Sequence, residues 1–127
     1  NLDTSYFRNY VRMKIVPKLS ADQRQELIKI RENTVKLYTE IDDQTKKLLV
    51  QNLEKGQLVR ARFVVLPYTV QKELTAVWLR INGLELHRKM IERAVLSIKT
   101  ALPGKQINLN SKASLLINKK TVTLILE

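Results

Sequence analysis

The chain has 127 residues, of which 23 are Lys or Arg and 12 are Asp or Glu, so its net charge is +11. This length suits one domain, and a hydrophobic content of 44% argues against disorder. The absence of Cys excludes disulfides, thiol nucleophiles and thiolate metal sites, and the single histidine, His87, excludes a His-rich zinc site. The longest apolar run, near residues 63–66, is far too short to cross a bilayer, so we expect a cytoplasmic chain without a membrane partner.

Residue 1 is Asn rather than Met, which N-terminal processing and excision from a longer protein explain equally well. None of the three Gly belongs to a GxGxxG or GxxxxGK[ST] loop. The sequence therefore predicts no nucleotide site, no metal site and no catalytic residue within these 127 residues.

The first segment, residues 1–18, predicts a helix that Asp3, Thr4 or Ser5 can cap. Its apolar residues recur at helical spacing, namely Tyr6, Tyr10, Val11 and Ile15. Pro17 disfavours helical geometry at the residue before it, so we expect a boundary or kink there.

A long helix is predicted over residues 21–53, with Ser20 and Asp22 at its start and Gln23 or Glu26 supporting the cap. Its apolar residues form one stripe with a repeat close to 3.5: Leu27, Ile30, Leu37, Ile41 and Leu48. We expect two later amphipathic helices to bury this stripe. The helix should stop at Lys55-Gly56.

Residues 58–66 alternate in the manner of a half-buried strand, with Arg60 and Arg62 on one face. Pro67 should end this strand, and Thr69 can cap a third helix that Asn82-Gly83 closes. The predicted buried face of the third helix comprises Val70, Leu74, Val77, Trp78 and Ile81.

A fourth helix is predicted over residues 86–101, with inward residues Ile91, Val95, Ile98 and Leu102. Three short strands follow, over 106–109, 113–117 and 121–126, separated by turns. The predicted fold is α+β and mostly α: four helices with a long second one, an internal strand and short C-terminal strands. We divide the chain into a linker helix, 1–19, and a helical domain with terminal β-hairpins, 20–127.

The positive charge is uneven, since residues 57–127 hold 12 basic and 4 acidic residues against 11 and 8 in residues 1–56. A surface that gathers Lys and Arg binds phosphates through counterion release, so we expect a polyanion partner. Arg8 and Arg12, four apart on a helix, point the same way and suit bidentate phosphate contacts, with Asn9 beside them.

Four further basic residues are weaker candidates for contact with an RNA backbone: Lys14, Lys18, Arg60 and Arg62. A polar sheet face towards water explains the last two slightly better. His87, near a helix start, suits a structural role better than a catalytic one.

Arg8-Asn9-Tyr10-Val11-Arg12, preceded by Asp3 and Tyr6 and followed by Ile15-Val16-Pro17-Lys18-Leu19, resembles a signature of the bacterial tRNA(Ile)-lysidine synthetases. In that family the signature joins an ATP-pyrophosphatase domain to a helical middle domain. The order of elements agrees over the rest of the chain, including a turn at Trp78–Gly83 and a Pro103-Gly104-Lys105 turn.

The resemblance implies a parent ligase that adenylates an anticodon cytidine of an isoleucine tRNA and couples L-lysine to it. ATP and Mg²⁺ would serve a Ser-Gly-Gly-x-Asp-Ser loop that is absent from these residues. By the family pattern, Arg8, Asn9 and Arg12 lie at the domain junction and face the catalytic cleft or the tRNA. The piece itself would hold tRNA without catalysing a reaction.

A second interpretation is a non-enzymatic basic helical module that binds RNA or a protein partner, with the stripe of residues 27–48 as the docking face. Whether the chain forms a homodimer stays open.

Overall fold

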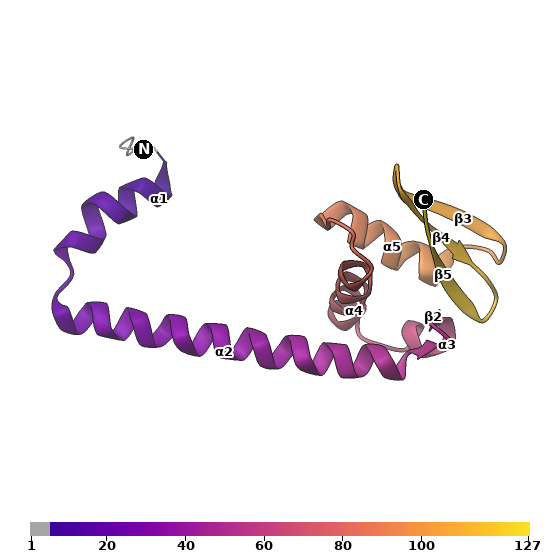
Figure 1. Ribbon diagram of the computed structural model, residues 1–127, viewed down its shortest axis with the longest axis horizontal. Helices are drawn as coiled ribbons and strands as arrows, with labels where there is room; N and C mark the ends of the chain where they lie inside the picture. Colours follow the sequence, from indigo (N-terminus) through magenta and orange to yellow (C-terminus); the bar gives the residue numbers. More distant parts are fainter. Residues whose placement is uncertain (1–5) are drawn as a thin grey trace. The chain divides into compact units, whose positions relative to one another are not determined.

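The computed structural model describes residues 6–127 of a chain that falls into two compact units, Asn1–Ile41 and Asp42–Glu127. The fold is α+β and mostly helical, with a long second helix, as the sequence predicts (Figure 1). Five strands are present in the described residues rather than four, because the chain forms an additional short strand after the long helix. The predicted caps Asp3, Thr4 and Ser5 lie outside the described residues.

The first unit begins with a helical segment that changes its geometry before Pro17. The helix α1 (Phe7–Tyr10) continues as a π-helical turn, η1 (Val11–Ile15), and a 3₁₀ turn, η2 (Val16–Lys18). Proline has no N–H to donate, and its ring would clash with the carbonyl of Met13 in a regular α-helix. The predicted boundary at Pro17 is therefore confirmed.

The helix α2 (Ala21–Gln51) starts with a reciprocal capping box. The Gln23 N–H donates to the Ser20 hydroxyl (3.2 Å), and the Ser20 N–H donates to Oε1 of Gln23 (2.9 Å). Two otherwise unpaired N–H groups of the helix start are satisfied in this way. The predicted start and length of this helix are confirmed to within two residues.

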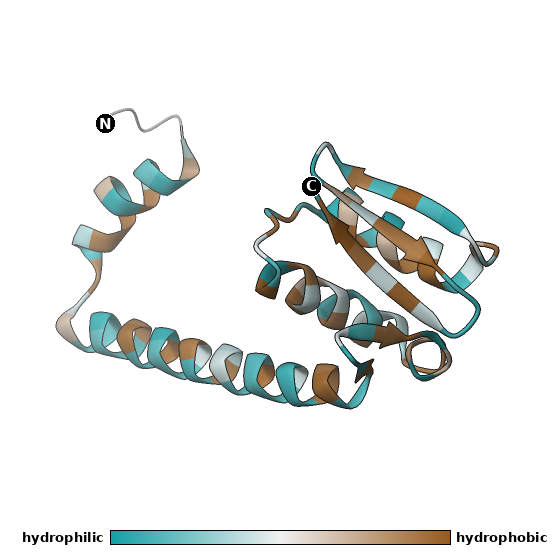
Figure 2. Ribbon diagram, turned by 45° about the vertical axis from the view of Figure 1, so that its right-hand side comes forward, coloured by the Kyte–Doolittle hydropathy of each residue, from teal (hydrophilic) through white to brown (hydrophobic). Residues whose placement is uncertain are grey.

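The predicted burial of the α2 stripe is wrong. Leu27, Ile30 and Leu37 are 51%, 60% and 55% exposed, and apolar and polar residues alternate along this helix (Figure 2). The buried core of the described residues takes Leu49 from α2, with Leu48 packed against it, and draws on no earlier residue. The later helices and strands fill that core with their own side chains, and the stripe residues 27–41 contribute none.

The second unit contains one antiparallel sheet in the order β1-β2-β5-β4-β3. Its strands are β1 (Leu53–Glu54), β2 (Gln57–Val59), β3 (Lys105–Asn110), β4 (Ala113–Ile117) and β5 (Thr121–Leu126). The turn between β1 and β2 has positive φ at both central residues, Lys55 (51°) and Gly56 (79°), as a two-residue hairpin requires. The three predicted C-terminal strands are confirmed.

Three helices complete this unit: α3 (Arg60–Val64), α4 (Tyr68–Ile81) and α5 (Arg88–Thr100). α5 contacts α4 and strands β3 and β4, and it lies against one face of the sheet (Figure 2). α4 ends as predicted, because Gly83 (φ 85°) and Leu84 donate to the carbonyls of Arg80 and Leu79. Phe63, Leu74, Leu79 and Ile98 are fully buried between these elements.

The strand predicted over 58–66 is wrong beyond Val59. The partner strand β5 begins at Thr121, which pairs with Val59, and the Arg60 N–H then bonds to Lys120 in the adjoining loop. With no further ladder partner, the chain leaves the sheet and forms α3. Arg60 and Arg62 therefore lie on a helix and do not share a sheet face.

Three smaller predictions about the helices are also corrected. Pro67, and not Thr69, precedes α4, and no side chain caps that helix. Ile81 and Leu102, predicted to point inwards, are 61% and 69% exposed. Both lie at or beyond a helix end, where helical spacing no longer sets the direction of a side chain.

Candidate nucleic-acid interface

The segment from α1 to η2 gathers the basic residues that the sequence singles out. Arg8 lies on α1, Arg12 and Lys14 lie on η1, and Lys18 ends η2; all four are exposed. Among the described residues, Arg8 and Arg12 have no hydrogen-bond or ion-pair partner. Guanidinium groups without protein partners keep all their donors for a ligand, and each can bind a phosphate through two parallel bonds.

Asn9 differs from its neighbours because it is half-buried and is not without a partner. Asn9 therefore already makes an interaction within the chain. Direct contact with a ligand has less support here than at the two arginines.

Aromatic and aliphatic side chains are interleaved with these basic residues. Phe7 is 80% exposed, Tyr6 63% and Tyr10 46%. Exposed aromatic rings beside arginines are the pattern of surfaces on which unpaired bases stack. The interleaving of aromatic and basic residues in 6–12 is the sequence signal that could have identified this surface. An analysis of helical periodicity does not detect it.

The junction between η2 and α2 is held by Arg24. Its Nη2 atom donates to the carbonyls of Val16 and Pro17, at 3.4 and 3.5 Å. The Val16 carbonyl also accepts a hydrogen bond from the Leu19 N–H at 3.1 Å, so the Arg24 side chain adds a donor where η2 ends. Arg24 thus has a structural role, in contrast to Arg8 and Arg12, for which the described part of the chain supplies no partner.

Arg60 is engaged by the backbone of the second unit. Its Nε donates to the carbonyl of Ile98 (2.7 Å), and its Nη2 donates to that of Ala101 (2.6 Å). These carbonyls end α5, where four backbone acceptors lack partners and the helix dipole favours a cation. Arg60 therefore serves as a C-terminal cap for α5, and few of its donors remain for phosphate.

Arg62 has a similar but weaker arrangement. Its Nη1 donates to the carbonyl of Gln51 (3.1 Å) at the end of α2, and its Nη2 lies 3.6 Å from Glu54. Of the seven predicted site residues, Arg8, Asn9, Arg12, Lys14 and Lys18 occupy one continuous segment, and Arg60 and Arg62 occupy α3.

His87 caps the N-terminus of α5, in agreement with the structural role predicted for it. Its Nδ1 atom accepts a hydrogen bond from the Met90 N–H at 3.3 Å. The imidazole therefore fills the place that Ser or Asp usually takes at a helix start.

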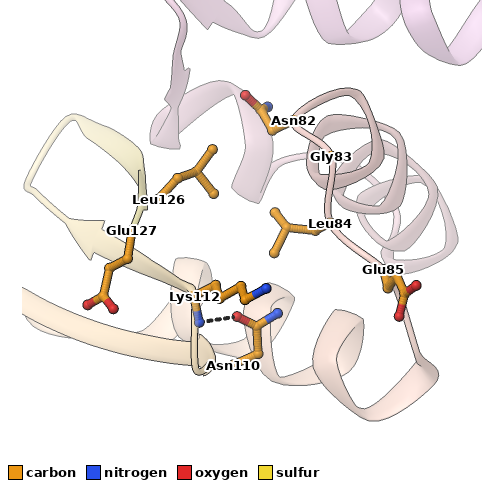
Figure 3. A pocket seen from close by; sticks show the side chains of 8 residues that line it. All are labelled: Asn82, Gly83, Leu84, Glu85, Asn110, Lys112, Leu126 and Glu127. Atoms are coloured by element: carbon orange, nitrogen blue, oxygen red, sulfur yellow. Dashed lines mark hydrogen bonds between the residues drawn. The ribbon is translucent and has the colours of Figure 1, made fainter.

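A hollow of about 440 Å³ lies between the α4–α5 loop and the ends of strands β3 to β5. Leu84 and Leu126 face into it, whereas the carboxylates of Glu85 and Glu127 point away (Figure 3). In the turn between β3 and β4, which lines the hollow, the Asn110 side chain accepts a hydrogen bond from the Lys112 N–H at 2.8 Å. The hollow has no converging catalytic groups.

Within residues 6–127 no group of three or more His, Cys, Asp or Glu side chains is placed to hold a metal ion. No helix in this range has the length and apolar character needed to cross a membrane.

Comparison with protein-family models gives no match, and a search of curated proteins finds none either. The resemblance to the lysidine synthetases therefore rests only on the sequence motifs described above.

Proposed function

We propose that this chain binds tRNA and is the tRNA-holding portion of a tRNA(Ile)-lysidine synthetase. The proposal rests on Arg8 and Arg12, which are exposed on one short helical segment and have no hydrogen-bond or ion-pair partner within residues 6–127. These arginines also form the centre of the resemblance to that family. Position on the RNA would be set by phosphate contacts, and selectivity would come from RNA shape and single-stranded anticodon bases.

In this proposal the chemistry belongs to another part of the parent enzyme. ATP, Mg²⁺ and L-lysine would bind the ATP-pyrophosphatase domain, while this chain holds the tRNA so that its anticodon cytidine reaches that domain. Arg8, Asn9 and Arg12 would lie where the two parts meet. The enzyme would act in the cytoplasm, where tRNA is modified.

Replacement of both Arg8 and Arg12 by Ala tests the proposal. Each arginine that contacts a phosphate adds about 0.7–0.9 to the slope of log K against log salt. We therefore expect weaker binding of an isoleucine tRNA transcript and a slope that is shallower by about one to two units. Fluorescence anisotropy titrations at several KCl concentrations measure both quantities.

The matched control is Lys29→Ala with Lys36→Ala, which removes the same charge from exposed positions of α2. Long-range electrostatics alone would give the two double variants equal effects. If the slope of log K against log salt is unchanged in the arginine variant, Arg8 and Arg12 do not contact phosphates.

The exposed stripe of α2 supports a second candidate, a protein-interaction module. Leu27, Ile30, Leu37 and Ile41 are all at least 43% exposed, and such a stripe suits docking against a helix groove or a second copy of the chain. The same titration separates the candidates, because a module of this kind would not bind the tRNA transcript while sedimentation would show dimers.

A further inference from the structure

Tyr68 stands at the start of α4 between two lysine side chains from different elements. The Lys72 ammonium lies 4.7 Å from the centre of its ring, and the Lys99 ammonium, from the last turn of α5, lies 5.6 Å from it. Tyr68 is 48% exposed. Both distances are within the range of a cation–π contact. One exposed ring thus holds two positive charges near each other, despite their mutual repulsion.

The acidic residue that lines the adjoining hollow, Glu92, already has an ion-pair partner. Glu92 accepts a hydrogen bond from Nε of Arg88 at 2.9 Å, and this contact raises the pKa of Arg88. Arg93 donates to the carbonyls of Asn108 and Leu109 at 2.6 and 2.8 Å. In the described part of the chain no carboxylate pairs with Lys72 or Lys99, so both charges are available to an anion.

A shallow hollow of about 520 Å³ adjoins the ring. We call it the Tyr68 hollow, and its lining residues are Tyr68, Lys89, Glu92, Arg93, Val95, Leu96 and Lys99. Leu96 is 60% exposed, although it occupies the middle of α5. The hollow therefore combines cationic groups with an apolar surface.

We propose that the Tyr68 hollow, together with Lys72 beside the Tyr68 ring, is a second RNA-binding surface. On this surface Lys72 and Lys99 contact backbone phosphate and Leu96 packs against a base. RNA supplies both parts, since each nucleotide carries an anionic phosphate and a flat apolar face. An anion between the two ammonium groups also relieves their repulsion. The choice of RNA as the polyanion rests on the proposed function, whereas the residues are separate from Arg8 and Arg12.

The Lys72→Gln/Lys99→Gln variant of the full chain tests this inference with an isoleucine tRNA transcript. Loss of two phosphate contacts predicts a slope that is shallower by about one to two units and affinity lower by about fivefold or more per contact at 0.1 M salt. Lys105→Gln/Lys119→Gln, which removes the same charge elsewhere in the unit, should change the slope much less.

Variants of Tyr68 test whether the ring positions the lysines. Tyr68→Phe keeps the ring and should bind as the parent chain does. Tyr68→Leu removes the ring and should reduce affinity without changing the number of charges. Circular dichroism establishes that each variant is folded.

The outcomes distinguish this inference from the proposed function. If Arg8→Ala/Arg12→Ala weakens RNA binding and Lys72→Gln/Lys99→Gln does not, the Tyr68 hollow is no RNA surface and the proposed function stands. If the parent chain does not bind the transcript at all, both fail. Loss of binding to phosphatidylserine vesicles, with RNA binding intact, would assign the hollow to membranes and overturn the inference.

Discussion

Arginine side chains in this protein divide according to whether the backbone already occupies their donors. Arg60 and Arg93 donate to carbonyls at distances of 2.6–2.8 Å, whereas Arg8 and Arg12 have no such partner within the described residues. A guanidinium satisfied by carbonyls stabilises the fold, and a solvated one is free to bind a phosphate. The residue type alone does not reveal this difference.

Replacement of Arg60 by Ala should destabilise the second unit. The carbonyls of Ile98 and Ala101 would lose a charged donor at the end of α5, and we expect the free energy of unfolding to fall by about 2–3 kcal/mol. Urea unfolding followed by Trp78 fluorescence measures this loss. Arg60→Lys should recover only part of it, because an ammonium cannot reproduce two directed contacts.

Arg62→Ala is the matched control for this substitution, since it removes the same side chain from the same helix. Its ion pair with Glu54 is exposed and long (3.6 Å), so its loss should cost less than about 1 kcal/mol. Equal effects of the two variants would mean that Arg60 is not a helix cap.

At the scale of elements, α2 depends on local interactions over its first half. The stripe of residues 27–41 is exposed, so tertiary packing contributes little there. The capping box at Ser20, together with hydroxyl contacts from Thr34 to Ile30 (2.7 Å) and from Thr39 to Val35 (3.0 Å), supplies hydrogen bonds within the helix. Nearer its end, a hydrogen bond to Asp42 (2.9 Å) raises the pKa of Lys46.

Ser20→Ala should therefore loosen the start of α2 without altering global unfolding. Loss of an N-cap costs about 1 kcal/mol of helix stability, and here no packed side chain compensates for it. Amide hydrogen exchange over residues 21–27 should become faster, while the urea midpoint of the core stays the same. Ser20→Asp, which preserves the cap, should retain the protection of the parent chain; a global loss of stability in Ser20→Ala would contradict this account.

Elements defined by neighbouring residues were predictable from the sequence. The capping residues Ser20 and Gln23, the closing Gly83 and the three terminal strands all depend on side chains and turns a few positions apart. The strand prediction for residues 58–66 was wrong beyond Val59. The alternation of this segment fits a strand, but the length of the strand is set by where its partner β5 begins. Within this segment only Leu58 and Val59 pair with β5, and residues 60–64 form a helix because no further strand partner is present.

At the scale of the whole molecule, the buried core belongs to the second unit. Within the described residues, its first members are Leu48 and Leu49, and none comes from residues 6–41. Positive charge is present in both units, since each contains exposed basic residues, such as Arg8 in the first and Lys99 in the second. The side chains that form the core are therefore distinct from the basic residues that we propose contact RNA.

A shortened chain, residues 42–127, should fold by itself. Because the core loses no member, we expect its free energy of unfolding to differ from that of the full chain by less than about 1 kcal/mol. Urea unfolding of the two chains, followed by the fluorescence of Trp78, gives the comparison. A shortened chain without a cooperative transition would show that the first unit supports the core.

The sequence by itself determined the α+β class, the long helix, the terminal hairpins and the exposed arginine pair, because these follow from the spacing of nearby residues. Tertiary structure decided that the α2 stripe stays exposed and that Arg60 caps α5. It also decided that the Tyr68 ring contacts the ammonium groups of both Lys72 and Lys99. Each of these outcomes depends on residues that are far apart along the chain, such as Arg60 and Ala101, and spacing carries no information about which distant groups meet.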